Sequence, residues 1–195
     1  MRQRIVAATA ERILQRGLGG TRLDDVRTDT LTSKSQLFHY FPGGKLELTR
    51  EVVAWQGERL YQAQQPAIDD LSTWESWEAW QACILQFYRS LKEYGCPIGS
   101  LTAESIAVDP ILAQQISTAV RQWRRQIAAG VRRLQKARLL SKKVDADVTS
   151  ASILAAIQGG AMMNVTEKAY WPLEAALAQS LAALRAHAIG ARTPL

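Results

Sequence analysis

The sequence predicts an all-α fold of about nine helices. No segment alternates apolar and polar residues in the way of a half-buried β-strand. Apolar residues recur instead at helical spacing, and Gly, Pro and N-cap residues interrupt the chain at helix-like intervals. With 195 residues, 47% of them hydrophobic and 22% charged, the chain can bury a core in one domain, or in a small domain joined to a larger one.

Three short helices are predicted in the first fifty residues. The first covers residues 2–16 and ends at Gly17. Thr21 is a suitable N-cap for the second helix and Ser33 for the third, which has to stop before Pro42. The apolar side chains expected to share one small core are those of Ile13, Val26, Leu37 and Phe41.

Six more helices are predicted over the rest of the chain. Their expected ranges are 45–65, 72–94 with Ser72 as N-cap, a short helix opened by Pro97 and Gly99, 110–137 with Asp109 as N-cap, about 145–168 from Asp145 or Asp147, and 172–189. The apolar stripe of the second of these comprises Trp77, Trp80, Ile84, Phe87, Tyr88 and Leu91.

The composition excludes several classes of protein. Two cysteines (Cys83, Cys96) and two histidines (His39, His187) cannot form a disulfide framework or a Cys/His zinc cluster, and no cofactor is expected. Charged residues interrupt the N-terminal apolar positions, which argues against a signal peptide. Residues 148–166 are uncharged, but their polar side chains disfavour a lipid-facing helix. We therefore expect a soluble, cytoplasmic protein without a membrane partner.

The formal net charge of +6 is unevenly distributed. Residues 1–50 have a net charge of +4, residues 51–95 of −4 and residues 96–195 of +6. Positive charge favours polyanionic partners, and the first basic block coincides with the three short helices. The second block, from Arg121 to Lys143, contains no acidic residue. It is interpreted as the solvated face of a long helix, with an anion or nucleic-acid site as the alternative.

The spacing of the second and third predicted helices suits a helix-turn-helix motif, in which the helix after Ser33 reads DNA. Gln36 can pair with an adenine edge, and Lys34 with guanine or a phosphate. Lys45 begins the fourth helix, where backbone N–H groups also favour a phosphate. Spacing and charge alone equally allow a small helical subdomain without a DNA role.

The N-terminal quarter resembles the DNA-binding domain of TetR-family transcriptional repressors. The matching positions are Ala7, Ala8, Gly17, Thr21, Asp25, Val26, Ser33, Lys34, Leu37, Phe38, Tyr40, Phe41, Lys45 and Leu48. The segments 41–45 (FPGGK) and 95–100 (GCPIGS) resemble the LmrA/YxaF-like branch of that family. The pattern fails at the turn between the two helices, where the family has a small residue, then a glycine, then a valine, and this chain has Arg27, Leu31 and Thr32. Leucine disfavours the left-handed conformation that glycine allows, so a strained or rearranged turn is expected.

The resemblance implies a helix-turn-helix DNA-binding domain over residues 1–48 and a ligand-binding and dimerisation domain over residues 49–195. It also implies a homodimer whose repression is relieved by a small molecule. The candidate DNA-binding residues carried over by position are Thr21, Ser33, Lys34, Ser35, Gln36, His39, Tyr40 and Lys45.

The aromatic residues beyond residue 50 can line a cavity for an apolar or aromatic ligand, although an ordinary core is the plainer interpretation. With the resemblance added, the candidate ligand-binding residues are Trp55, Trp80, Phe87, Trp123 and Met162. Cys96 is interpreted as a small buried residue, with a reactive sensor thiol as the alternative.

The last two predicted helices suit a four-helix interface between two copies of the chain. The candidate interface residues are Ser152, Ala156, Gly160, Leu173, Leu177, Leu181 and Leu184. The same helices can instead pack only within one chain.

Together these inferences predict a ligand-responsive transcriptional repressor that binds near-palindromic, double-stranded operator DNA as a homodimer. A small apolar or aromatic effector molecule is expected to release it. The alternatives are a small-molecule-binding helical enzyme and an adaptor without a DNA role. We expect no enzyme, because neither a Gly-rich phosphate loop nor a paired-carboxylate motif is present.

Overall fold

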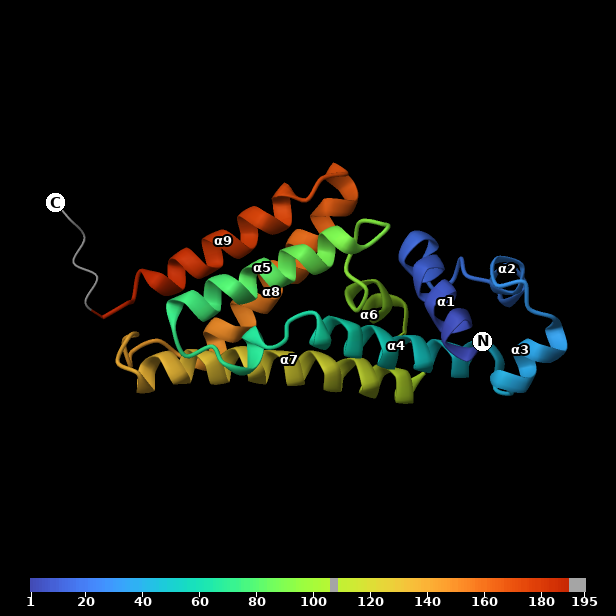
Figure 1. Ribbon diagram of the computed structural model, residues 1–195, viewed down its shortest axis with the longest axis horizontal. Coiled ribbons are helices and arrows are strands. Elements are labelled where there is room, and N and C mark those ends of the chain that lie inside the picture. Colours follow the sequence, from blue (N-terminus) through green and yellow to red (C-terminus); the bar gives the residue numbers. More distant parts are fainter. Residues whose placement is uncertain (106–108, 190–195) are drawn as a thin grey trace. The chain divides into compact units, whose positions relative to one another are not determined.

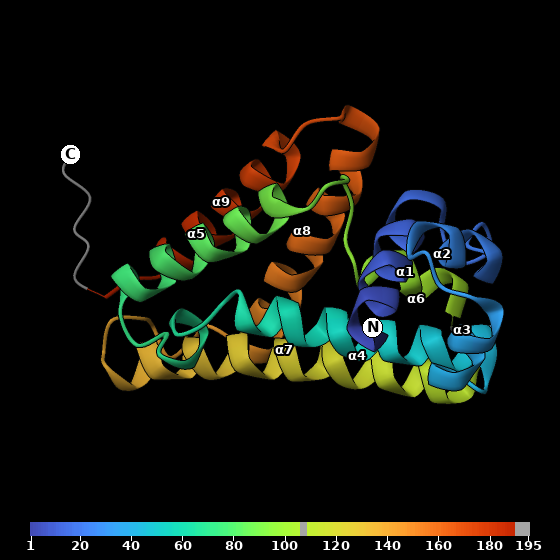
Figure 2. The same ribbon diagram turned by 45° about the vertical axis from the view of Figure 1, so that its right-hand side comes forward.

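The computed structural model describes residues 1–105 and 109–189 of the chain (Figures 1 and 2). These residues contain nine α-helices, one 3-10 helix and no β-strand beyond an isolated bridge between Leu140 and Ala188. The elements are α1 (Arg2–Arg16), α2 (Leu23–Asp29), α3 (Lys34–Tyr40), α4 (Gly44–Gln62), η1 (Ala67–Asp69), α5 (Trp74–Ser90), α6 (Gly99–Ser105), α7 (Pro110–Lys136), α8 (Ala146–Glu167) and α9 (Trp171–Arg185). The predicted all-α fold is confirmed.

Three predicted N-caps are confirmed by their hydrogen bonds. Ser33 accepts one backbone N–H from the first turn of the helix that follows, and Asp109 and Asp145 each accept two. These side chains satisfy donors that have no partner inside the helix, which is why residue type and spacing point to them.

Two other predicted N-caps are wrong. The N-cap of α2 is Arg22, which makes no side-chain capping bond, while the Thr21 hydroxyl donates to Gly17 O at 2.8 Å. The N-cap of α5 is Thr73 and not Ser72, because Thr73 forms a capping box with the third residue of the helix. In both cases the helical backbone begins one residue later than the side-chain pattern suggested.

Three helices also end earlier than predicted. α4 ends at Gln62, α5 at Ser90 and α9 at Arg185. The expected stop residues Pro66 and Gly95 set outer limits, and the chain leaves the helix in turns before it reaches them. The turn after α4 leads into η1, which the sequence pattern did not predict.

The chain divides into two compact units. Unit 1 comprises Met1–Leu60 and Gly95–Ala119, and unit 2 comprises Tyr61–Tyr94 and Val120–Leu195. The helices α4 and α7 contribute residues to both. The predicted domain boundary after residue 48 separates two expected functions and not two compact units, and it stays a prediction.

Unit 1 contains the small core that the sequence predicts. The side chains at most 2% exposed there include Ile13, Val26, Leu37 and Phe41. Cys96 is fully buried, and its Sγ accepts the N–H of Gly99 at 3.2 Å, in keeping with its interpretation as a small core residue.

Within unit 1, α4 packs beside the first turns of α7, and the two helices run in the same direction. Arg50 pairs with Asp109, and a Cβ placed on Gly57 would lie 4.0 Å from the Cβ of Ala119, further along both helices.

Unit 2 buries the predicted apolar stripe of α5. Its buried members are Trp77, Trp80, Ile84, Phe87 and Tyr88, and Leu91 is half-buried. Gly130 of α7 meets two large side chains here, since an added Cβ would lie 2.6 Å from Leu71 Cβ and 3.1 Å from Trp77 Cζ2. No side chain fits at this position without movement of those neighbours.

The helices α5 and α9 lie side by side in unit 2 and run in opposite directions (Figures 1 and 2). Two surface ion pairs join them near their ends, Glu78 with Arg185 and Arg89 with Glu174. Of the second basic block, Arg121, Arg125, Arg132 and Lys136 are exposed on α7, Arg124 and Arg133 are half-buried, and Arg138, Lys142 and Lys143 are exposed after the helix ends, so the solvated-face interpretation fits most of its members.

The helix α8 packs closely on the start of α9. An added Cβ on Gly160 would lie 2.6 Å from Leu173 Cα and 3.2 Å from Pro172 O. By length and composition, α8 is the one helix among the described residues that could cross a membrane. Core helices of soluble proteins pass the same test, and 39% of its apolar stretch is buried inside the fold.

Candidate nucleic-acid interface

The turn between α2 and α3 has the hydrogen bonds of a Schellman motif. Thr32 N–H donates to Arg27 O at 3.0 Å, and Leu31 N–H donates to Thr28 O at 3.2 Å. The motif requires a left-handed residue after the helix cap, and Leu31 takes that conformation with a φ of 47°. Its side chain is 89% exposed. Of the two expected outcomes, the turn is therefore strained and not rearranged.

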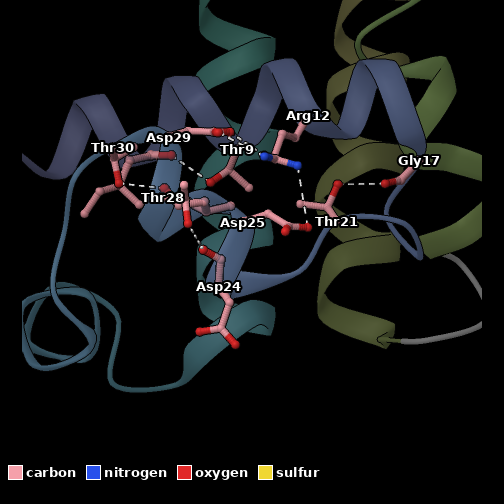
Figure 3. Close-up of polar contacts among 11 residues, drawn as sticks. Thr9, Arg12, Gly17, Thr21, Asp24, Asp25, Thr28, Asp29 and Thr30 are labelled. Atoms are coloured by element: carbon pink, nitrogen blue, oxygen red, sulfur yellow. Dashed lines mark hydrogen bonds and ion pairs between the residues drawn. The ribbon is translucent and has the colours of Figure 1, made fainter.

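Two arginines of α1 fix the position of α2. The Arg12 guanidinium donates from two nitrogens to the carboxylate of Asp29 and lies 3.5 Å from that of Asp25 (Figure 3). This hydrogen bond lowers the pKa of Asp29 below its ordinary value. Arg4 donates to the carbonyl of Thr30, the C-cap of α2, at 2.7 Å. α1 therefore holds α2, the helix that precedes α3.

The helix α3 presents polar side chains to solvent. The exposed candidates are Ser33, Lys34, Ser35, Gln36 and His39, and Tyr40 is half-buried. The rings of His39 and Tyr40 form an edge contact, with 5.3 Å between centroids. Leu37, on the opposite side of the same helix, is fully buried. Six of the eight candidate DNA-binding residues thus lie together on or next to one short helix.

The other two candidates both donate a hydrogen bond to a backbone carbonyl group in the loop between α1 and α2. Thr21 is 2% exposed and donates to Gly17 O, whereas the Lys45 ammonium donates to Leu18 O at 2.6 Å. The hydroxyl proton of Thr21 is therefore used inside the protein. The ammonium of Lys45 has two further N–H groups that can reach another acceptor.

Sequence reasoning missed Phe38 as a surface residue of α3. Its side chain is 39% exposed, and one ring edge lies 3.6 Å from the position of a Cβ on Gly44. The signal was present, because Phe38 follows the polar residues Lys34 and Ser35 by four and three positions and so shares their side of the seven-residue helix. An aromatic side chain at this place can contact a thymine methyl group.

The candidate ligand-binding residues divide between the two units. Trp55 is half-buried in unit 1, with the guanidinium of Arg59 4.6 Å from its ring centroid. In unit 2, Trp80 and Trp123 are buried, and both indole N–H groups donate to Gln64 Oε1 at 2.8 Å. Sequence reasoning missed Gln64, since no periodicity marks a polar core residue.

The two other ligand candidates differ in exposure. Phe87 is 5% exposed and packs edge-on against the ring of Tyr88. Met162 is 51% exposed on α8. A pocket residue is ordinarily shielded from solvent, so the structure supports Phe87 better than Met162 as a lining residue.

Most candidate dimer-interface residues are covered by their own chain. Leu173, Leu177 and Leu184 are at most 3% exposed, and Gly160 is in contact with α9. Ala156 and Leu181 are half-buried, and Ser152 is exposed. The apolar side chains that α8 and the start of α9 leave exposed are Val148, Met162, Met163, Val165 and Trp171.

An all-α chain whose N-terminal helices form a helix-turn-helix with a polar, exposed second helix has the architecture of a DNA-binding regulator. A family model described as the C-terminal domain of tetracyclin repressor-like proteins matches residues 75–180. The HTH-type transcriptional regulator YxaF of Bacillus subtilis is 28% identical over 173 residues, 85% of each chain. The regulator LmrA of the same organism is 24% identical over 88% of this chain and 90% of its own.

Solved structures show the same fold. A TetR transcriptional regulator from Chloroflexus aurantiacus superposes with a TM-score of 0.84 at 21% identity, over 96% of this chain and 95% of its own. A TetR regulatory protein from Rhodobacter sphaeroides gives a TM-score of 0.82 at 18% identity, over 96% and 98%. The chain belongs to the TetR family of transcriptional regulators. It is therefore a transcriptional regulator and not an enzyme. Members of this family bind DNA.

Proposed function

We propose that the chain is a repressor that binds a near-palindromic operator as a homodimer and is released by a small molecule. The observation that carries this proposal is the face of α3, where five polar candidates are exposed while Leu37 anchors the helix in the core. Such a helix can enter a major groove without uncovering its apolar side. We place this action in the cytoplasm, where chromosomal DNA is accessible.

Footprinting of the full chain on the DNA that flanks its own gene tests operator binding. We expect two protected half-sites whose centres lie roughly 34–36 Å apart, or a multiple of that distance. Binding should weaken steeply with salt, because each phosphate contact releases a counterion. Absence of any protected site would contradict the proposal.

Charge-matched variants localise the interface. Lys34→Gln should weaken binding to all sequences and reduce the salt slope by about 1, as expected for one lost phosphate contact. Lys142→Gln removes an exposed lysine from the second basic block and should change neither quantity. An equal loss in both variants would favour the alternative that the second block also binds DNA.

We propose that a second copy of the chain covers the exposed apolar side chains of α8 and the start of α9. Val148 is 64%, Met163 51% and Trp171 55% exposed in the single chain. Most leucines of α9 are instead buried in the core of the same chain. Sedimentation should give about twice the mass of 21.6 kDa. Met162→Glu should shift the protein towards monomer, and Gln86→Glu, which adds the same charge on exposed α5, should not.

We propose that the effector is a small apolar or aromatic molecule bound among the aromatic side chains of the larger domain. The burial of Trp80, Phe87 and Trp123 supports this class of ligand. The effector must bind the DNA-free form more tightly than the DNA-bound form, since differential affinity is what releases the operator. A panel of planar aromatic compounds, screened for operator release together with a change in tryptophan fluorescence, tests this proposal.

A further inference from the structure

A reciprocal pair of hydrogen bonds joins Ser33 and Gln36 at the start of α3. Ser33 Oγ accepts the N–H of Gln36 at 3.1 Å, and Gln36 Oε1 accepts the N–H of Ser33 at 3.0 Å. A backbone N–H can only donate, so the atom of Gln36 that faces it has to be the amide oxygen. Chemistry therefore fixes which end of the Gln36 amide points back to the helix and which end points away.

The free end of this amide is a donor. The side chain of Gln36 is exposed, and its Nε2 makes no hydrogen bond to any residue that the structure describes. Nε2 carries two N–H groups and accepts nothing. Lys34, exposed two residues earlier, likewise offers only donors.

An adenine contact of the usual kind conflicts with this arrangement. Glutamine reads adenine with both ends of its amide, as Oε1 accepts from N6 and Nε2 donates to N7. In α3 the extended side chain needed for that contact would release the N–H of Ser33, which has no other partner at the helix start. Guanine presents two acceptors in the major groove, N7 and O6, and thymine presents O4, whereas adenine presents its one acceptor, N7, beside the N6 amino donor, which opposes a second N–H donor.

We propose that Gln36 contacts DNA through its amide N–H donors alone. It therefore prefers a base that presents hydrogen-bond acceptors, with guanine bound more tightly than thymine, and not the adenine that glutamine usually selects. This inference rests on the proposed function as an operator-binding protein. It makes Gln36 a specificity-determining residue whose preference is set by its capping bond to Ser33.

The test uses the full chain and random-sequence DNA, from which bound sites are selected and sequenced. Dissociation constants are then measured for all four bases at each half-site position. Gln36→Met removes both donors and the amide oxygen, while Gln36→Glu keeps an acceptor for Ser33 N–H and removes the donors. Ratios between bases are compared within each protein, so that the added negative charge of Gln36→Glu cancels.

The wild type should prefer guanine or thymine at one position of each half-site by about tenfold. Gln36→Met should lose that preference, and Gln36→Glu should shift it to cytosine, whose N4 amino group donates. A preference for adenine that disappears in Gln36→Met would overturn the inference, and so would a pattern that neither variant changes. If the wild type selects no sequence, the proposed function itself fails, which is a different result from an altered pattern in the variants.

Discussion

Arg50 and Asp109 form an ion pair in unit 1, with 2.8 Å between Arg50 Nε and Asp109 Oδ2, although 59 positions separate them in sequence. Asp109 is 5% exposed and also caps α7 through the N–H groups of Ile111 and Leu112. The pKa of Asp109 is lowered, first by the hydrogen bond from Arg50 and then by those backbone donors. The pair ties α4 to the first turn of α7.

Arg50→Gln should lower the free energy of unfolding, because it leaves the shielded carboxylate of Asp109 with only its capping bonds. Arg2→Gln is the control, since Arg2 and Glu51 form a pair of the same length whose side chains are 46% and 38% exposed. Urea unfolding should show the larger loss for Arg50→Gln. A double-mutant cycle with Asp109→Asn that gives no coupling free energy would show that the Arg50–Asp109 ion pair does not stabilise the fold.

Acid should weaken this tie. The pKa of Asp109 is lower in the folded state than its unfolded value of about 3.9, so the unfolded state binds the proton first on acidification. The contribution is complete above the unfolded pKa and is lost as the pH falls through the folded one. Stability below about pH 4 should therefore depend less steeply on pH in Asp109→Asn than in the wild type, as urea titrations at several pH values can measure. Equal slopes would contradict this.

Leu31→Gly should raise stability by about 0.5–1 kcal/mol, because glycine adopts the left-handed conformation without strain while gaining some freedom in the unfolded chain. Little burial is lost, since the Leu31 side chain is 89% exposed. Leu31→Ala keeps the strain and removes the exposed side chain, so its stability should stay near that of the wild type. Thermal unfolding measures the stability of the three proteins. A glycine variant less stable than the wild type would show that the backbone at Leu31 is not strained.

Gln64→Leu should destabilise the protein by about 2–4 kcal/mol, because two buried indole N–H groups lose their acceptor. Gln65→Leu is the neighbouring control. The Nε2 of Gln65 is buried and has no partner among the described residues, so its removal should be neutral or slightly stabilising. Urea unfolding followed by tryptophan fluorescence measures the stability of both variants. Equal changes would show that the hydrogen bonds accepted by Gln64 do not stabilise the fold.

Gly160→Ala should destabilise by about 1–3 kcal/mol, because the new Cβ would meet the backbone of α9 and force the two helices apart. Gly57→Ala is the matched control, as its Cβ would find an ordinary contact at 4.0 Å. That variant should gain about 0.5–1 kcal/mol from reduced chain entropy in the unfolded state. Calorimetry that ranks Gly160→Ala as stable as Gly57→Ala would contradict the close contact.

The helices and the small N-terminal core could be predicted because their signals are local. The N-caps Ser33, Asp109 and Asp145 satisfy donors within three residues, so residue type and spacing indicate them, although the same signals placed two other N-caps one residue too early. The pairing of Gln64 with Trp80 and Trp123 bridges 16 and 59 positions, and nothing in the local pattern encodes it.

The candidate interfaces were harder to assign because exposure depends on tertiary packing. A leucine such as Leu177 suits a partner helix of its own chain as well as one of a second copy, and only the fold shows that it is fully buried. The proposed reading helix was predicted from spacing, charge and the family resemblance, and the orientation of the Gln36 amide could have been predicted as well. Ser33 and Gln36 stand at the spacing of a capping box, which predicts that the amide oxygen turns to the backbone.

The crowding at Gly130 has a consequence for how this sequence can drift. Leu71 and Trp77 occupy the space that any side chain at position 130 would need. Replacement of the glycine is then tolerated only after one of the two large residues has become smaller, so the order of the substitutions matters. Among relatives that keep this packing, the three positions should change together, and a lineage with a larger residue at 130 should carry a reduced side chain at 71 or 77.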